Sequence, residues 1–394
     1  MDIISSQGMI KKNLATAPAP HMHSPLSTTM IMAITLISLM PAFIVMITFF
    51  GTGVVWQFFI SASTAFICQL ICGFLRHRSL YKSVGDLSYL ITALLLALTI
   101  PPLLPAYFTI LATVFAIIVV KECFGGLGMN IFNPAMAGFV FLLISAPSQM
   151  FDTFIAPASH AYEVASLERT YNVIFSNEDP ALLHKEVMEL NNENDALSGA
   201  TWLETMKTAK KSGNISDVRE ANYKDGAESA YLYLAIAYAL GGCVLIAFRI
   251  IFLRMVISFF LSFSIFVLIG KHFFPSLVLN LDTQLILGGT MLGAFFIITD
   301  PVTNAGTAKG RIVFAILTAF LIVIIRAFGS YSDAVAFAVL LSNSAAPLID
   351  VLTHRRPYGV GFAKKELLKP RPEPNINDVL DVNDKSKINN GDKA

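Results

Sequence analysis

The sequence has 394 residues, of which 55% are hydrophobic and 14% are charged, and its mean hydropathy is +0.64. A soluble globular domain carries about 25% charged residues, so the composition excludes an ordinary soluble fold and indicates an integral membrane protein. The formal net charge of +1 gives no basis for a nucleic-acid partner, and none is expected.

Residues 1–29 are polar and contain no signal peptide, so we expect a cytoplasmic N-terminal segment there. The chain then becomes a series of apolar runs, and a helix needs about 20 apolar residues to cross the hydrocarbon layer. Measured against that length, the sequence predicts an all-α integral membrane fold with about ten transmembrane helices. These cover residues 30–50, 54–75, 87–104, 106–122, 132–147, 230–248, 250–270, 284–299, 312–328 and 333–350.

Basic residues in the short connections predict how the helices are oriented, because Lys and Arg gather on the cytoplasmic side of a membrane. With ten helices, the basic connections fall on one face, and Lys271 is the main exception. Both termini are then cytoplasmic, and residues 148–229 form an external loop, in the periplasm of a Gram-negative cell. The basic positions are Lys11, Lys12, Arg76, Arg78, Lys82, Lys121, Arg249, Arg254, Lys309, Arg311, Arg355 and Arg356.

The two halves of the membrane region resemble each other at an offset of about 200 residues: Val114–Ile117, for example, recurs as Val313–Ile316. Because five helices is an odd number, the second copy has to be inverted in the bilayer, as in many transporters. We therefore expect two inverted five-helix repeats, residues 30–147 and 230–352. The chain from Lys369 onward is rich in Pro, Asn and Asp, and residues 353–394 are expected to be a largely disordered cytoplasmic tail.

The external loop contains a run of small residues, Ser198-Gly199-Ala200-Thr201, and Asp195 precedes it. Gly199 permits backbone conformations that other residues avoid, and its small neighbours leave the Thr201 hydroxyl accessible. The Asp195 carboxylate is suited to help an enzyme hold a metal or phosphate while that hydroxyl is modified. Taken alone, such a run is more often an ordinary loop.

In this context the run Asp-x-x-Ser-Gly-Ala-Thr resembles the acceptor motif of flavin transferases, which join FMN through its phosphate to the threonine oxygen. The rest of the chain is similar to the family of the D subunit of the Rnf electron-transport complex, which is related to the B subunit of the sodium-translocating NADH:quinone reductase. The similarity covers nearly all of residues 20–360. It rests on Lys121-Glu122, Phe124–Gly126, Asn133–Ala135, Gly289–Phe296, Thr299–Pro301, Ala345–Pro347 and Asp350, while Arg356–Gly359 favours the Rnf protein.

The resemblance implies a redox role in a bacterial inner membrane. A member of this family would relay electrons through FMN held as a phosphoester on Thr201, as part of a translocase that passes electrons between ferredoxin and NAD and moves sodium ions or protons. The related quinone reductase also suggests a second, non-covalent flavin, riboflavin. Ser198, Gly199, Ala200 and Asp195 would complete the attachment motif.

The chain itself carries neither the glycine-rich signature of NAD binding nor the cysteine spacing of an iron–sulfur cluster. Those centres are therefore expected on partner subunits of the complex, among them iron–sulfur subunits and a second flavin-carrying subunit. A flavin transferase is the expected maturation partner. We assign this chain no catalytic residue of its own, and its four cysteines, which form no CxxC pair, predict no metal site.

Acidic residues near the membrane are candidates for ion coupling, because a charge at depth is costly and usually faces a cavity or a partner. Asp300 follows a predicted helix and precedes Pro301, at the position equivalent to Pro101 in the first half, where broken helices are expected. Glu122 and Asp350 are further candidates. For Arg326, near the outer end of its helix, we expect a side chain that extends to the interface.

Two alternatives to a redox function are open at this point. Inverted repeats without a redox role would make the chain a transporter or channel, and a purely structural role would make it a membrane anchor for other subunits. A third possibility, within the family, is the B subunit of the quinone reductase. The run Ser198–Thr201 discriminates, because neither a pure transporter nor an anchor requires a flavin acceptor outside the membrane.

Overall fold

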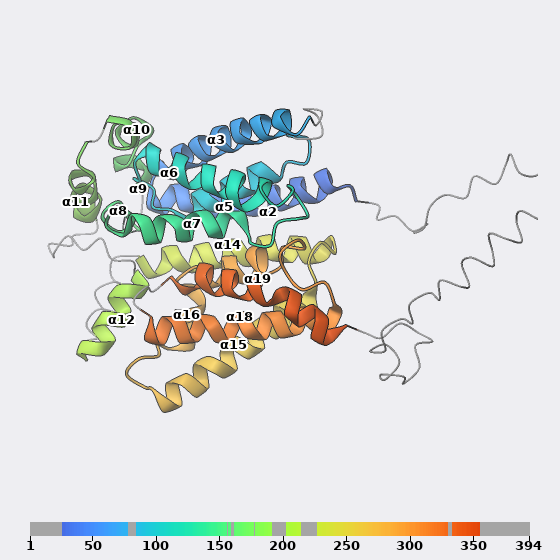
Figure 1. Ribbon diagram of the computed structural model, residues 1–394. Coiled ribbons are helices and arrows are strands. Elements are labelled where there is room, and N and C mark those ends of the chain that lie inside the picture. Colours follow the sequence, from blue (N-terminus) through green and yellow to red (C-terminus); the bar gives the residue numbers. More distant parts are fainter. Residues whose placement is uncertain are drawn as a thin grey trace, which may run out of the picture. The chain divides into compact units, whose positions relative to one another are not determined.

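The computed structural model describes residues 26–77, 84–155, 157–158, 161–176, 178–190, 202–213, 227–329 and 333–354, and these residues form helices and turns without any strand (Figure 1). Within the described residues, helical segments occupy all ten ranges in which the sequence predicts membrane helices. Most of the predicted N-terminal segment and tail, residues 1–25 and 355–394, lies outside the described residues.

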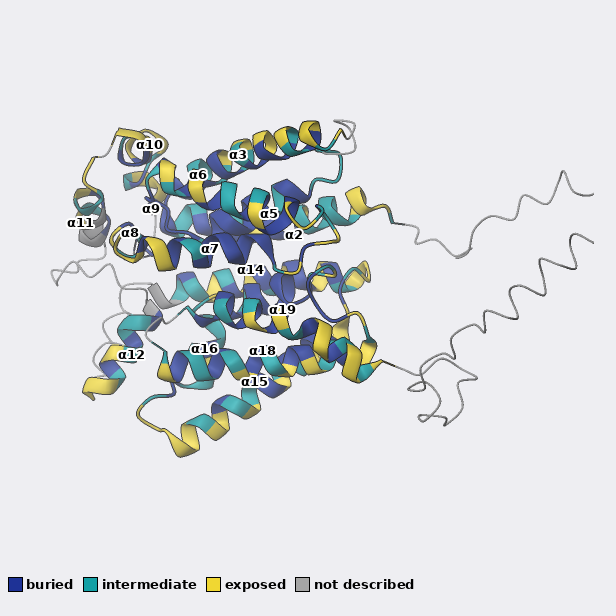
Figure 2. Cartoon of the chain, in the orientation of Figure 1, coloured by how far each residue is buried: buried dark blue, intermediate teal, exposed yellow. Residues whose placement is uncertain are grey.

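Six helices of the described chain are long and apolar enough to cross a membrane, so the chain is a multi-pass membrane protein. Large apolar side chains such as Phe59 and Ile67 are exposed on their outward faces, which suits contact with lipid (Figure 2). The six helices are α2 (Thr28–Phe50), α3 (Gly53–Leu75), α14 (Ala227–Ala247), α15 (Leu253–Phe273), α18 (Ala308–Phe328) and α19 (Ala334–Thr353).

The other four predicted ranges contain shorter elements, because glycine and proline interrupt them. Helix α5 ends at Thr99, just before Pro101 and Pro102, since a proline disfavours helix in the residue that precedes it. Helix α7 begins where Asn133 caps it and Pro134 takes its first position. The shorter elements are α5 (Ser88–Thr99), α6 (Ala106–Val114) with the π-helix η1 (Phe115–Glu122), α7 (Pro134–Ser145), and α16 (Leu281–Ile286), α17 (Thr290–Leu292) and the π-helix η2 (Gly293–Ile297).

Contacts among the elements follow the same pattern in the first half (α2 to α7) and the second half (α14 to α19). If α2, α3, α5, α6–η1 and α7 correspond to α14, α15, α17–η2, α18 and α19, most of the packed pairs correspond too, although the contact between α2 and α3 has no counterpart of similar size between α14 and α15. For example, α3 packs on α5 and α6–η1, as α15 packs on η2 and α18. The halves meet where α2 packs against α14 and α7 against α19.

Five further helices follow the first half in the chain and gather at one end of the helices (Figure 1). The first four belong with the first half: Ile155, Ala161 and Val173 share a buried cluster with Leu103, from the α5–α6 connection. The fifth packs on the second half, where its Leu203 shares a cluster with Leu279 and others. The five are α8 (Pro147–Asp152), α9 (Ala161–Val164), α10 (Leu167–Ser176), α11 (Pro180–Leu190) and α12 (Trp202–Ser212).

The second half contains a helix break that a buried arginine holds in place. Helix α16 stops before Gly288 and Gly289, whose φ values of +65° and +66° favour glycine. The guanidinium of Arg326 donates to the carbonyl oxygens of Gln284 (2.8 Å) and Gly288 (2.9 Å) and to Thr290 Oγ1 (2.9 Å). Carbonyl oxygens that a helix break leaves free inside a membrane need such donors. Arg326 therefore provides hydrogen bonds to the backbone at this break.

The expectation that Arg326 extends to the interface is therefore wrong, because its side chain is 6% exposed and turned inward to the break. For an arginine near the end of an apolar helix, extension to the interface is the usual outcome. The break at Gly288–Gly289, which was not predicted, changes that outcome by placing free carbonyls within reach of the guanidinium.

Arg326→Met should destabilise the chain by about 3 kcal/mol, because it leaves several buried carbonyls without a donor. Arg326→Lys should recover part of the loss, since an ammonium group still donates to one or two of them. The measurement is the free energy of unfolding of the purified chain in detergent. The exposed Arg254→Met serves as the control and should change it by no more than about 0.5 kcal/mol. Equal stability of Arg326→Met and Arg254→Met would contradict the role given to Arg326.

Candidate functional site

A cavity of about 100 Å³ lies between the two halves, and we call it the Asp300 cavity. The first half contributes Lys121 and Asn133, and the second contributes Asp300 from the turn after η2. Its wall mixes these groups with apolar side chains, so a charged or polar species inside it would find hydrogen-bonding partners. The further polar lining residues are Thr35, Ser88, Thr92, Asn130 and Thr299.

Lys121 is held on the wall of the Asp300 cavity by side chains of two other elements. Its Nζ donates to Gln69 Oε1 of α3 (3.1 Å) and to Ser88 Oγ at the start of α5 (2.6 Å), and the residue is 2% exposed. The adjacent Glu122 turns elsewhere and forms an ion pair with Arg76 (2.9 Å). Lys121 is thus a buried amine that forms hydrogen bonds and takes part in no ion pair among the described residues.

Asp300 combines a place on the cavity wall with a local structural role. One carboxylate oxygen accepts from the Val302 N–H (3.1 Å) and the other from the Thr303 hydroxyl (3.0 Å). These bonds close the turn that follows η2. Each carboxylate oxygen can accept a further bond, so the same group retains capacity for a cation or proton that enters the cavity.

The other acidic candidates do not line the Asp300 cavity. Asp350, near the end of α19, accepts from the N–H groups of Gly306 (2.8 Å) and Thr307 (3.0 Å) and so ties down the loop before α18. Glu122 is paired with Arg76. Among Asp300, Glu122 and Asp350, the structure thus brings Asp300 alone to the wall of a cavity between the halves.

A second cavity, of about 150 Å³, lies at the end of the helices where α8 to α12 gather, and we call it the Leu203 cavity. It is mainly apolar, with Leu203 of α12 on one side and Tyr238 of α14 on another. Asp333 gives it a carboxylate, and Gly288 and Gly289 place the helix break on its wall. The hydrogen bonds from Arg326 to the helix break therefore shape this cavity as well as the fold.

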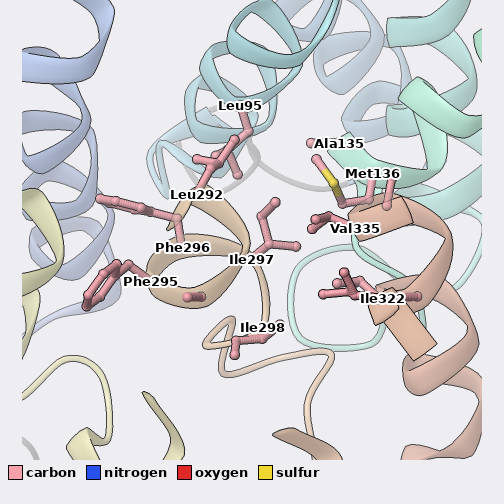
Figure 3. Packing of buried hydrophobic residues seen from close by; sticks show 14 of the residues in the cluster. Leu95, Ala135, Met136, Leu292, Phe295, Phe296, Ile297, Ile298, Ile322 and Val335 are labelled. Atoms are coloured by element: carbon pink, nitrogen blue, oxygen red, sulfur yellow. The ribbon is translucent and has the colours of Figure 1, made fainter. Parts of the chain in front are cut away.

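An apolar layer lies between the two cavities. Three elements, α5, α7 and η2, each contribute residues to both cavities, and in each element a residue on the wall of the Asp300 cavity lies close in sequence to one on the wall of the Leu203 cavity. All of these side chains are buried in the central cluster, and Figure 3 shows several of them packed around η2. The pairs are Leu95 with Leu98, Ala135 with Met136, and Phe296 with Ile297.

Helix α12 is fixed on the second half by apolar and polar contacts. Leu203 and Met206 are buried against Leu279 and Leu287. On the same helix, the Lys207 ammonium donates to the Gly329 carbonyl oxygen (2.7 Å), and Lys210 donates to the Val278 carbonyl oxygen. The two lysines supply donors to carbonyls at the ends of neighbouring elements, which anchors the helix at the rim of the Leu203 cavity.

The packing of α12 on the second half shifts the pKa values of three of its titratable groups. Burial, and then the neighbouring Asp333, raise the pKa of Glu204, while Lys207 lowers it. Burial is also the main reason that the pKa values of Lys207 and Lys210 lie below their usual range. The shifts of all three pKa values reflect partial loss of water around the charges, as expected for a helix packed on the membrane region.

The predicted attachment motif, Asp195 with Ser198–Thr201, lies outside the described residues. Its position in the chain is nevertheless informative, because Thr201 directly precedes Trp202, the first residue of α12. Leu203 follows two residues later and lines the Leu203 cavity. Two residues of chain span at most about 7 Å, so the covalent chain limits how far an acceptor at Thr201 can be from Leu203.

Comparison with known proteins completes the description of the site. Residues 15–359 match the model of the family described as NQR2, RnfD, RnfE. Two relatives, from Salmonella paratyphi A and Tolumonas auensis, are each named as the D subunit of an ion-translocating oxidoreductase complex. Each is 38% identical to the chain, over 351 and 349 residues. The alignments cover 87% and 88% of this chain and 97% and 99% of those proteins.

Proposed function

Because the chain belongs to the NQR2, RnfD, RnfE family and is a subunit of an ion-translocating oxidoreductase complex, we propose that it relays electrons through an FMN joined by a phosphoester to Thr201. The two relatives are D subunits of such complexes and match over nearly their whole length, so the complex is of the Rnf type. Electron flow between ferredoxin and NAD would be coupled to the movement of sodium ions or protons.

The docking of α12 is the observation that carries the proposal. A flavin supplies one- and two-electron chemistry when bound, but it serves a relay only if its distance from donor and acceptor is fixed. Lys207 and Lys210 hold α12 to the second half, and Thr201 directly precedes that helix. The free N–H groups in the first turn of a helix favour an anion beside them, so the start of α12 fits a phosphoester.

The two cavities support the coupling part of the proposal. They open from opposite ends of the interface between the halves, and the apolar layer at Leu95, Met136 and Ile297 separates them. An apolar constriction of this kind keeps ions out until its side chains move. We propose Asp300 as the coupling carboxylate, because it lines its cavity, whereas the contacts of Glu122 and Asp350 favour structural roles.

The proposed architecture is a ten-helix domain of two inverted five-helix repeats in a bacterial inner membrane, with both termini cytoplasmic. The matching contact pattern of the two halves supports the repeat. The proposed domain limits are residues 30–147 and 230–352 for the repeats and 148–229 for the external loop. NAD and iron–sulfur centres belong to partner subunits, a flavin transferase completes maturation, and we assign no site to the riboflavin that the resemblance allows.

Thr201→Ala should abolish covalent flavin, because the substitution removes the oxygen that forms the phosphoester. The chain should still insert and accumulate, since Thr201 directly precedes α12 and belongs to none of the predicted membrane helices. The measurement is flavin fluorescence of the chain on a denaturing gel under ultraviolet light. Thr201→Ser keeps a hydroxyl and should retain part of the signal, and Asp195→Ala should reduce it.

Thr208→Ala is the matched control, because Thr208 is an exposed threonine further along α12 and should leave the fluorescence unchanged. Fluorescence that persists in Thr201→Ala would rule out Thr201 as the acceptor. Loss of fluorescence in Thr208→Ala as well would indicate a folding effect of the substitutions, and the accumulation of each variant in the membrane distinguishes that case.

Asp300→Asn should weaken the dependence of turnover on the transported ion while the flavin content stays normal. The amide preserves the shape and the bond from the Val302 N–H but removes the charge from the cavity wall. Asp350→Asn is the control, because that carboxylate faces loop N–H groups rather than the cavity. Turnover at varied sodium concentration and pH is measured in the assembled complex, and unchanged ion dependence in Asp300→Asn would assign the residue to the turn alone.

A further inference from the structure

Helix α10 (Leu167–Ser176) presents three distinct faces. Thr170, Val173 and Ile174 are buried against the first half, and Ile174 shares a cluster with Ile60 and Ala106. With about 3.6 residues per turn, a second face carries exposed polar groups. The third is an apolar stripe at four-residue spacing, in which Leu167 is 50%, Tyr171 43% and Phe175 45% exposed.

The stripe joins an aromatic cluster on the membrane region. Trp56, in the first turn of α3, packs its ring against Tyr171 (5.4 Å between centroids) and Phe175 (5.8 Å). Its indole N–H donates to the Leu167 carbonyl oxygen (3.0 Å). Trp and Tyr are enriched where a membrane meets water, because their rings combine an apolar body with a polar group.

The aromatic cluster continues the apolar outer face of α3. Along that helix Phe59 and Phe66 follow Trp56 at steps of three and seven residues, which keep them near one face, and both are exposed. Because α3 crosses the membrane, these side chains face lipid. Helix α10 packs on α3, and both helices carry exposed residues (Figure 2), so the exposed apolar side chains of α3 and of the stripe form one surface.

Polar contacts fix α10 in this position and mark its water side. The turn between α2 and α3 holds the start of the helix, because Thr52 donates to the Ala165 carbonyl oxygen (2.7 Å) and lies 3.2 Å from the Thr170 hydroxyl. On the polar face, Arg169 forms an ion pair with Glu186 of α11. The charged face thus turns toward the other external helices, away from the stripe.

We propose that α10 lies in the outer lipid–water interface of the membrane, with Leu167, Tyr171 and Phe175 among the lipid chains and headgroups. An amphipathic helix with such a face binds in the plane of the interface. A stable protein–protein interface buries about 800 Å² on each partner, which three side chains on a ten-residue helix do not provide. The proposal rests on the proposed topology, in which residues 148–229 are external, and is independent of the flavin on Thr201.

Photo-crosslinking tests the proposal in the intact complex in its native membrane. The photoreactive aromatic residue p-benzoylphenylalanine is introduced at Tyr171 or at Phe175, where it replaces one aromatic ring with another. After irradiation, mass spectrometry of the α10 peptide should find a phospholipid adduct at both positions. The same residue at Phe66 is the positive control for lipid contact, and at Ser176, on the polar face, it should give no lipid adduct.

An adduct between Tyr171 or Phe175 and another polypeptide would overturn the proposal and identify the stripe as a subunit interface. The absence of lipid adducts at both positions, with a normal lipid adduct at Phe66, would overturn it as well. A variant that fails to accumulate is replaced by the same substitution at Leu167, the third residue of the stripe, to which the same outcomes apply.

Discussion

The hydrogen bonds from Arg326 to the broken helix are the interaction on which the second half depends. Inside a membrane no water is available to bind free carbonyl oxygens. A helix can therefore be interrupted there only where other protein groups donate hydrogen bonds to those oxygens. The guanidinium meets that need for Gln284 and Gly288. The first half has a smaller counterpart, in which the Lys121 ammonium donates to Ser88 at the start of α5, just after the left-handed Leu87.

Beside these two buried side chains, the interface between the halves contains short elements in place of continuous helices. Short elements, α5 in one half and α17 with η2 in the other, meet near its centre and leave a cavity toward each end. The apolar layer between the cavities consists of residues from the same short elements and from α7 (Figure 3). A limited movement of these elements would therefore change the access of an ion to both cavities at once.

Much of the fold follows from hydrophobic patterning, and the departures from prediction have physical causes. Apolar run length places all ten helical ranges, and the proline pair at Pro101 explains where α5 ends. The break at Gly288–Gly289 was missed because glycine is common in membrane helices, and that break reversed the expected orientation of Arg326. The partner of Glu122 is Arg76, 46 positions away in the sequence, and one sequence gives no measure of such a distance in space.

The central claim is that α12 is anchored on the second half, so that an acceptor just before it stays beside the Leu203 cavity. A disulfide between Leu203→Cys and Leu287→Cys tests it directly. The chain carries serine in place of its native cysteines, Cys68, Cys72, Cys123 and Cys243, and a protease site within residues 214–226. After oxidation and cleavage, the account predicts one flavin-fluorescent band of full length, which a reducing agent splits in two. Cleavage into two fragments under oxidising conditions as well would contradict it, because α12 would then lie away from Leu287.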